Sequence, residues 1–110
     1  MFDIITIGTA TKDTVLKSAH FKTLHSKRGP VKDYEIVPLG STVDVGDVFF
    51  STGGTAINAA TTFARQGFRT GVVTRIGNDS SANDIRRDCT RDGVDFSRAI
   101  VDGHHATAHS

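Results

Sequence analysis

Four residues of this chain suit the binding of a polar small molecule: Asp13, Gly53, Gly54 and Asn58. Two adjacent glycines let another group approach the backbone closely, because neither carries a Cβ. If a helix follows them, the N–H groups of its first turn point at the same place. An amide side chain about one turn further on can donate and accept hydrogen bonds there. A glycine-rich turn that binds nothing is the alternative interpretation of this stretch.

The residues after the glycine pair predict such a helix. Apolar residues recur at helical spacing over 56–64 and Gly67 is a suitable left-handed stop, so we expect a helix over 54–66. Before it, residues 2–8 indicate a buried strand rich in isoleucine. Asp13 comes just beyond the carboxyl end of that strand, where open α/β sheets collect their ligands. The local pattern alone favours a turn or cap role for Asp13.

The second half of the chain alternates strand and helix patterns. The expected elements are a strand at 70–77, a helix that starts at 78–80, short strands at 94–96 and 99–101, and a further strand near 107–110. This alternation predicts an α/β fold with a parallel sheet of strands 2–8, 70–77 and 95–101 and two crossover helices. In the second helix, Cys89 falls on the apolar stripe with Ala82 and Ile85, which predicts a core residue rather than a reactive thiol.

The stretch between the first strand and the glycine pair predicts an appended small sheet. Residues 34–37 and 43–50 alternate well enough for strands, and residues 38–41 mark a turn between them. Such antiparallel strands, inside an otherwise βαβ chain, would lie apart from the parallel sheet. Residues 44–47 fit a turn or a bulge as well. In residues 15–35, Val15 and Leu16 fit a short strand and residues 26–30 fit a loop, but the rest shows no clear pattern.

Composition and motifs exclude several classes of protein. The formal net charge of +1 argues against a nucleic-acid or membrane-surface partner held by electrostatics. No apolar run approaches the roughly 20 residues of a membrane-spanning helix, and the N-terminus lacks a signal-peptide pattern. With a single cysteine, these features predict a cytoplasmic location. No P-loop or G-x-G-x-x-G occurs, and the spacing of His104, His105 and His109 fits no metal-binding motif.

The segment from Gly53 to Asp79 resembles the N-terminal signature of the PfkB, or ribokinase-like, carbohydrate kinases. It runs G-G-T-A-I-N-A-A-T-T-F-A-R-Q-G and, after one residue, R-T-G-V-V-T-R-I-G-N-D. The shared features are a glycine pair, an asparagine on the following helix, small residues along it, a glycine stop and a strand that ends in Gly-x-Asp. A second glycine often follows in the family, where this chain has Ala82 and Asn83. The resemblance covers most of residues 2–110.

The resemblance implies a ribokinase-like, Rossmann-like fold that is incomplete in this chain, with a small antiparallel β lid within about 15–52. Residues 1–110 would be the N-terminal part of a PfkB-type kinase domain. It implies substrate-binding roles for the four residues Asp13, Gly53, Gly54 and Asn58. In the family, the lid covers the sugar and in several members makes a homodimer contact. ATP, Mg²⁺ and the catalytic base belong to the family's second half, so no catalytic residue is expected here.

One main hypothesis and two alternatives follow. The main hypothesis is the N-terminal fragment of an ATP-dependent kinase that transfers the γ-phosphoryl group of ATP to a hydroxymethyl group of a sugar or nucleoside. The alternatives are a non-catalytic module that binds a small molecule and a dimerising fragment that uses the strands within 34–50. Since the catalytic base and the anion hole are absent, we expect no kinase activity from these 110 residues alone.

Overall fold

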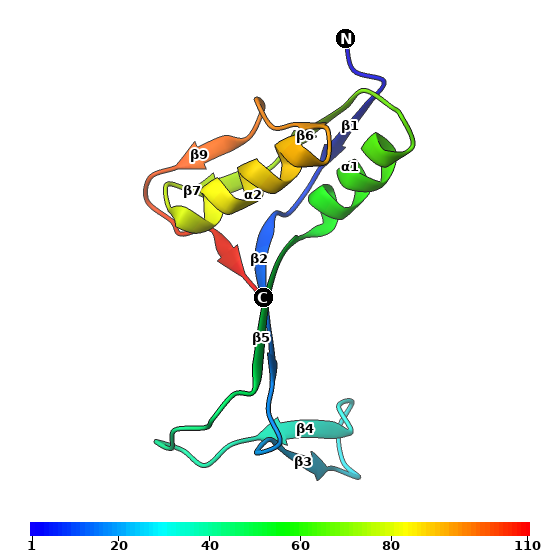
Figure 1. Cartoon of the computed structure of the whole chain (residues 1–110). Helices are drawn as coiled ribbons and strands as arrows, with labels where there is room; N and C mark the ends of the chain where they lie inside the picture. Colours follow the sequence, from blue (N-terminus) through cyan, green and yellow to red (C-terminus); the bar gives the residue numbers. More distant parts are fainter. The chain divides into compact units, whose positions relative to one another are not determined.

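The computed structural model describes all residues from Met1 to Ser110 (Figure 1). They form two compact units: unit 1 comprises Met1–Thr14 and Phe50–Ser110, and unit 2 comprises Val15–Phe49. None of the helices combines the length and the apolar character that a membrane crossing requires.

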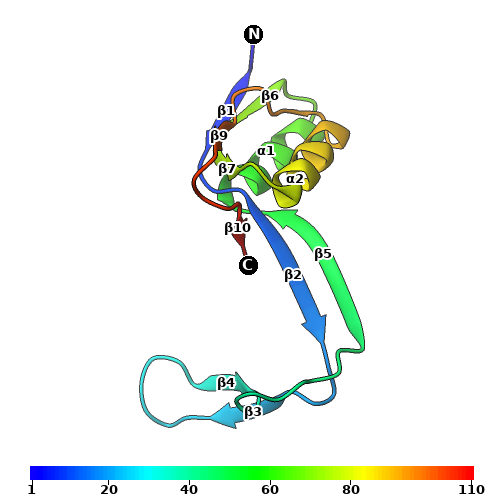
Figure 2. The same cartoon turned by 90° about the vertical axis from the view of Figure 1, so that its left-hand side faces the viewer.

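Unit 1 contains a parallel sheet with two crossover helices. The strands, in spatial order, are β1 (Ile4–Ile7), β6 (Thr70–Val73) and β8 (Val94–Asp95). The helices are α1 (Thr55–Arg65) and α2 (Ser80–Arg91), and Figure 2 shows both on the same side of β1 and β6. The expected α/β fold with a parallel sheet and crossover helices is confirmed.

Both helices lie where the local sequence predicts them. The chain leaves α1 through Gly67, which has a φ of +93° that favours glycine. The carboxylate of Asp79 caps α2 by accepting a hydrogen bond from the backbone N–H of Ala82 at 2.9 Å. The expected apolar stripe of α2 is buried: Ala82, Ile85 and Cys89. These three residues pack in one core with apolar residues of α1, β6, β7 and β8.

The first strand is buried on one face only. Thr6 is 9% exposed and its hydroxyl donates to the carbonyl of Ala56 in α1, whereas Ile7 is 78% exposed. The apolar run 2–8 therefore forms the expected strand, but the prediction that it is buried holds only for the face toward the helices. The reason is that both helices cover the same side of the sheet.

The expected strand 70–77 is divided in two at Thr74. Its second part is β7 (Arg75–Gly77), which pairs with β9 (Ile100–Asp102) in a separate two-stranded parallel sheet. At the break, the carbonyl of Thr74 accepts a hydrogen bond from the N–H of Ile100 at 2.8 Å. The expectation of one sheet that holds all of 70–77 and 95–101 is therefore wrong.

The stretch after β1 forms strand β2 (Thr11–Lys17), which includes both the polar residues 11–14 and the short strand expected at Val15 and Leu16. In its sheet, β2 lies between β10 (Ala108–His109) and β5 (Asp47–Gly53). Asp13 therefore lies beyond the end of β1, as expected, but inside a strand, so the turn or cap role that the local pattern favours is wrong. The local sequence could not show this, because the pairing partner of β2 in β10 lies far along the chain.

Unit 2 contains an antiparallel pair of strands, β3 (Lys22–His25) and β4 (Asp33–Ile36). The prediction that residues 34–37 belong to an antiparallel sheet is confirmed, although its partner β3 lies in the stretch without a clear pattern. The prediction that 43–50 joins this small sheet is wrong, because its strand residues belong to β5, beside β2. Of the residues 44–47 that fit a turn or a bulge, residues 44–46 lie outside any strand, but Asp47 begins β5.

An ion pair joins the starts of β1 and β6. Arg69 donates to both carboxylate oxygens of Asp3, through Nη2 at 2.6 Å and Nε at 3.0 Å, and its backbone N–H donates at 2.8 Å. The side-chain and backbone hydrogen bonds from Arg69 lower the pKa of Asp3 from 3.8 to about 2. The ion pair therefore stabilises the fold above the unfolded-state pKa, and this contribution is lost as the pH falls through the folded-state value.

We predict that Asp3→Asn removes this pH dependence. The free energies of unfolding of the wild type and the variant should differ at pH 6 and converge as the pH falls from about 4 to about 2, because protonated Asp3 no longer attracts Arg69. Urea denaturation across this pH range measures the effect. A difference that stays constant down to pH 2 would contradict the role of the Asp3 charge.

Candidate functional site

The carboxylate of Asp13 lies directly against Gly53. Any Cβ at Gly53 would overlap the Oδ2 atom of Asp13, and it would lie 3.0 Å from the carboxyl carbon. Thr11 donates a hydrogen bond to the other carboxylate oxygen, Oδ1, at 2.7 Å. Strands β2 and β5 thus bring together two of the four residues that the sequence singled out, and Thr11 orients the carboxylate.

Gly54 packs against the turn between β1 and β2. Its backbone has φ 97° and ψ 153°, a conformation that residues with a side chain rarely adopt. A Cβ here would overlap the carbonyl of Thr9 and lie 2.9 Å from the Cα of Ala10. The sequence correctly indicates that another group approaches each glycine closely. In the structure these groups are Asp13 and the Thr9–Ala10 backbone.

The first turn of α1 is capped by Thr9. The N–H of Thr55 donates to the Oγ1 atom of Thr9 at 3.0 Å, and the N–H of Ala56 donates to the Thr9 carbonyl at 3.1 Å. In return, the Thr9 N–H donates to the hydroxyl of Thr55 at 3.2 Å. The expectation of free N–H groups at this helix start is therefore wrong for these two. They do not suit a phosphate group, because their protons already have acceptors.

Asn58 lies one turn into α1, as expected, and its side chain is exposed. Together with Thr61, Thr62 and Arg65 it lines a cleft of about 670 Å³, whose other walls come from α2, β2 and β5. Asp13 is not among the residues that line this cleft, although its neighbour Lys12 is. Adjacent strand residues point to opposite faces, which accounts for this separation.

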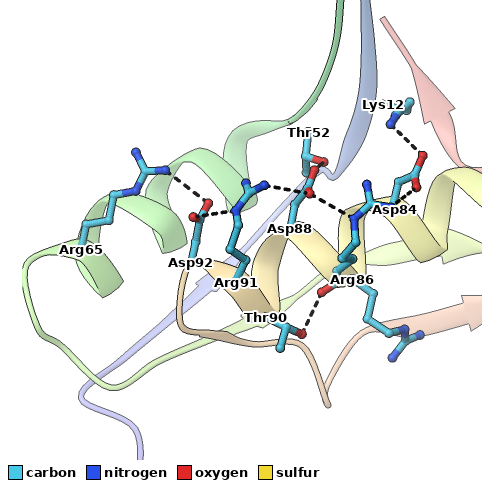
Figure 3. Close-up of polar contacts among 10 residues, drawn as sticks. Lys12, Thr52, Arg65, Asp84, Arg86, Asp88, Thr90, Arg91 and Asp92 are labelled. Carbon is cyan, nitrogen blue, oxygen red and sulfur yellow. Dashed lines mark hydrogen bonds and ion pairs between the residues drawn. The ribbon is translucent and has the colours of Figure 1, made fainter.

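A row of ion pairs runs along α2 beside this cleft (Figure 3). At one end Lys12, whose side chain is 12% exposed, pairs with Asp84 at 2.8 Å, and at the other end Arg65 of α1 pairs with Asp92 at 3.3 Å. The links between them are Asp84–Arg87, Arg87–Asp88, Asp88–Arg91 and Arg91–Asp92. The three-residue spacing could have predicted the Asp84–Arg87 and Asp88–Arg91 pairs, but the pairs to Lys12 and Arg65 depend on the tertiary structure.

Cys89 is among the residues that line the cleft, and it is buried. Burial, and next the negative charges of Asp88 and Asp92, raise the pKa of this thiol to about 11. A thiol of that pKa is protonated at neutral pH and is a poor nucleophile. The prediction of a core residue is confirmed.

The three histidines near the C-terminus make separate contacts. The Nδ1 atom of His105 lies 2.8 Å from the carboxylate of Asp102, and the Nε2 atom of His109 lies 3.1 Å from the hydroxyl of Ser81. The backbone N–H of His104 donates to Asp102 at 2.9 Å. The His109 contact joins β10 to helix α2, and the other two join the loop after β9 to Asp102 of that strand.

Residues 30–109 match the sequence profile of the pfkB family of carbohydrate kinases. This chain belongs to that family. The match includes the glycine pair, α1, the Gly-x-Asp segment and α2, and it also includes the second half of unit 2.

Solved structures of the family share the fold. A ribokinase from Arabidopsis thaliana, solved with ribose and ATP, is 20% identical with a TM-score of 0.75, and the alignment covers 98% of this chain and 30% of that one. A ribokinase from Cryptococcus neoformans, in complex with ADP, is 19% identical with a TM-score of 0.70 and coverages of 96% and 28%. A PfkB protein from Polaromonas is 23% identical with a TM-score of 0.71 and coverages of 99% and 30%. The fold is therefore ribokinase-like, and the chain spans about 30% of the length of these relatives.

Proposed function

We propose that this chain is the substrate-binding part of a kinase that transfers the γ-phosphoryl group of ATP to a hydroxymethyl group of a sugar or nucleoside. The observation that carries the proposal is the carboxylate of Asp13, which lies against the side-chain-free Gly53 and is oriented by Thr11. An ionised carboxylate accepts hydrogen bonds only, so hydroxyl groups are its natural ligands. A ligand at this place can also reach the backbone beside the glycine pair.

The chain's contribution to the reaction would be positioning. Phosphoryl transfer depends mainly on alignment of the reacting groups and on electrostatic stabilisation. In the proposed arrangement Asp13 accepts hydrogen bonds from two substrate hydroxyls, and the substrate extends into the cleft beside α2. There the Asn58 amide donates to one hydroxyl and accepts from another. Gly53 makes room for the Asp13 carboxylate and Gly54 for the Thr9–Ala10 backbone. In the proposed arrangement the sugar lies against the backbone of this glycine pair.

ATP with Mg²⁺ would supply the phosphoryl group, as the ATP and ADP in the related ribokinase structures suggest. The residues of this chain do not fit that cofactor. The N–H groups of Thr55 and Ala56 already donate to Thr9, so the start of α1 does not form a phosphate cradle. Asp13 alone does not provide the carboxylate set that holds Mg²⁺. We therefore propose that the nucleotide binds outside these residues, and that this chain binds substrate without phosphorylating it.

Unit 2 is proposed to act as the lid over the substrate and, in a longer protein, as a homodimer contact. Its strands carry exposed apolar side chains, among them Leu24, Tyr34 and Ile36, which suit a surface that closes on a ligand or a second subunit.

A cytoplasmic location belongs to the same proposal, because the single cysteine, Cys89, is a free thiol.

Calorimetric titration of D-ribose, D-fructose and adenosine into the chain tests the proposal. We expect Asp13→Ala and Asn58→Ala each to weaken binding of the preferred ligand by about 5- to 150-fold, since the loss of such a hydrogen-bonding partner costs roughly 1–3 kcal/mol.

Asp95→Ala and Asn78→Ala are the matched controls, because they remove the same side-chain types elsewhere in unit 1. Circular dichroism establishes that all four variants are folded. Unchanged affinity in folded Asp13 and Asn58 variants would show that these residues are structural. If a longer form of the wild-type protein bound the ligand but showed no kinase activity, the result would favour the non-catalytic binding module.

A further inference from the structure

Asp79 does more than cap α2. Its carboxylate accepts three hydrogen bonds: from the N–H of Ala82 at 2.9 Å, from the N–H of Thr107 at 2.8 Å and from the Thr107 hydroxyl at 2.7 Å. Thr107 is 2% exposed, and its oxygen also accepts a hydrogen bond from the N–H of Gly77 at 3.0 Å. Gly77, Asp79 and Thr107 thus form one interlocked group, which we call the Asp79 clamp.

The clamp has no room for a side chain at Gly77. A Cβ there would lie 2.7 Å from each of three atoms: Oδ2 of Asp79, the carbonyl oxygen of His105 and the backbone nitrogen of Thr107. The Gly-x-Asp pattern of this chain is therefore explained by contacts to the segment before β10. Gly77, the last residue of β7, and Asp79, the N-cap of α2, thus both contact the segment that leads into β10.

Through β10, the clamp reaches Asp13. Ala108 and His109 pair in parallel with Thr11 and Lys12, and Ser110 continues the ladder. The N–H of Ser110 donates to the carbonyl of Lys12 at 3.0 Å, and the carbonyl of Ser110 accepts from the N–H of Thr14 at 2.8 Å. Ser110 therefore holds the peptide groups on both sides of Asp13.

Two side-chain contacts connect the same helix to the same strands. Lys12, the neighbour of Asp13, pairs with Asp84 at 2.8 Å, and Ser81 lies in hydrogen-bond distance of His109 at 3.1 Å. The hydrogen bond from Lys12 lowers the pKa of Asp84, as the hydrogen bonds from Thr107 lower that of Asp79. Both carboxylates are thus ionised at neutral pH, where hydrogen bonds to them are strong.

We propose that Asp79 is a positioning residue for Asp13: by anchoring Thr107 it sets the register of β10 on β2 and so holds the Asp13 carboxylate against Gly53. The inference rests on the proposed function of Asp13 as a ligand of the substrate. A carboxylate is required at this position. An asparagine would present its NH₂ group either to the N–H of Thr107 or to that of Ala82, and two donors cannot pair.

Asp79→Ser and Thr107→Val separate positioning from capping. Serine is a good N-cap residue and so keeps the contact to Ala82, but it is too short to hold Thr107. Valine keeps the branched shape of Thr107 and removes only its hydroxyl, leaving the α2 cap intact. Thr107→Ser, which retains the hydroxyl, is the matched control.

The first measurement is residue-resolved hydrogen exchange of the complete 110-residue chain without ligand. In Asp79→Ser and Thr107→Val, the amides of Thr14 and Ser110 should exchange about tenfold faster or more, since the loss of a hydrogen bond to a charged group costs at least about that factor. The amides of Ile5 in β1 and Ile85 in α2, and all amides of Thr107→Ser, should keep their wild-type rates within about twofold. Unchanged exchange at Thr14 and Ser110, or equal acceleration throughout unit 1, would overturn the inference.

The second measurement is titration with D-ribose. Affinity should fall about fivefold or more in Asp79→Ser and Thr107→Val and remain in Thr107→Ser, because a displaced carboxylate no longer meets the sugar hydroxyls. Unchanged ribose affinity in the two variants, beside a wild type that binds, would overturn the inference. A wild type that binds none of ribose, fructose and adenosine would overturn the proposed function instead, and exchange at Thr14 and Ser110 still decides whether the clamp holds the strand.

Discussion

Gly54→Ala is expected to lower the free energy of unfolding by roughly 2–6 kcal/mol. About 1–3 kcal/mol comes from placing a side chain at φ 97° and ψ 153°, and a similar amount from the overlap of the new Cβ with the Thr9 carbonyl. The free energy of unfolding of a small domain is only about 5–15 kcal/mol, so the variant would lose a large part of its stability. Urea denaturation followed by circular dichroism measures the loss.

Gly67→Ala is the matched control for this prediction. Gly67 has a nearly equal φ of +93°, but a Cβ there would meet no atom within 4 Å. Its substitution should therefore cost only the backbone strain of about 1–2 kcal/mol. Equal losses at the two positions would show that the contact between Gly54 and the Thr9–Ala10 backbone does not exist in solution. Gly54→Val would place a larger side chain against the Thr9–Ala10 backbone and so destabilise the fold. Its effect on sugar binding therefore has to be measured on protein that is still folded.

Ile85→Ala should lower the free energy of unfolding by about 2–5 kcal/mol. Ile85 is fully buried in the core beneath α2, and its truncation leaves a cavity that the surrounding side chains fill only in part. Thermal and urea denaturation measure the effect, with folded protein verified at low temperature.

Ile7→Ala is the control, because it removes the same side-chain atoms from a position that is 78% exposed on β1. Its cost should stay within about 1 kcal/mol, the range of strand propensities. If Ile7→Ala were as destabilising as Ile85→Ala, the open face of the sheet would be covered in solution. Repeating the denaturation at several protein concentrations would then reveal self-association, because the stability of an associated state rises with concentration.

Local sequence determined the two helices and their ends. In α1 the spacing of apolar residues over 56–64 and the glycine at 67 are signals within the helix itself or one turn from it. The same is true of α2, where Asp79 caps the first turn and the buried stripe ends in Cys89. Helix hydrogen bonds join residues four apart, so the information that specifies them is close in the sequence. The β1 strand was equally evident from its run of isoleucines.

Strand pairing was decided by the tertiary structure. Residues 11–17 contain polar side chains that suggest a loop, and they form β2 because β10 and β5 lie on either side of it. The break in the strand at Thr74 likewise depends on Ile100, whose N–H donates a hydrogen bond to the Thr74 carbonyl and so pairs it with a strand outside the first sheet. In unit 2, β3 exists through its pairing with β4. The backbone N–H and C=O groups of a strand find hydrogen-bond partners only in a neighbouring strand, and that strand can be anywhere along the chain.

The candidate site shows the same division. The glycine pair by itself determined that some group must come close to the backbone, since only glycine tolerates such an approach. Which groups come close was decided by the fold: the carboxylate of Asp13 at Gly53 and the carbonyl of Thr9 at Gly54. The fold also gave the N–H groups of α1 an acceptor in Thr9 and turned Asn58 toward the cleft beside α2. These contacts join segments some 40 to 50 residues apart in sequence, and no local pattern encodes the distance between two such side chains.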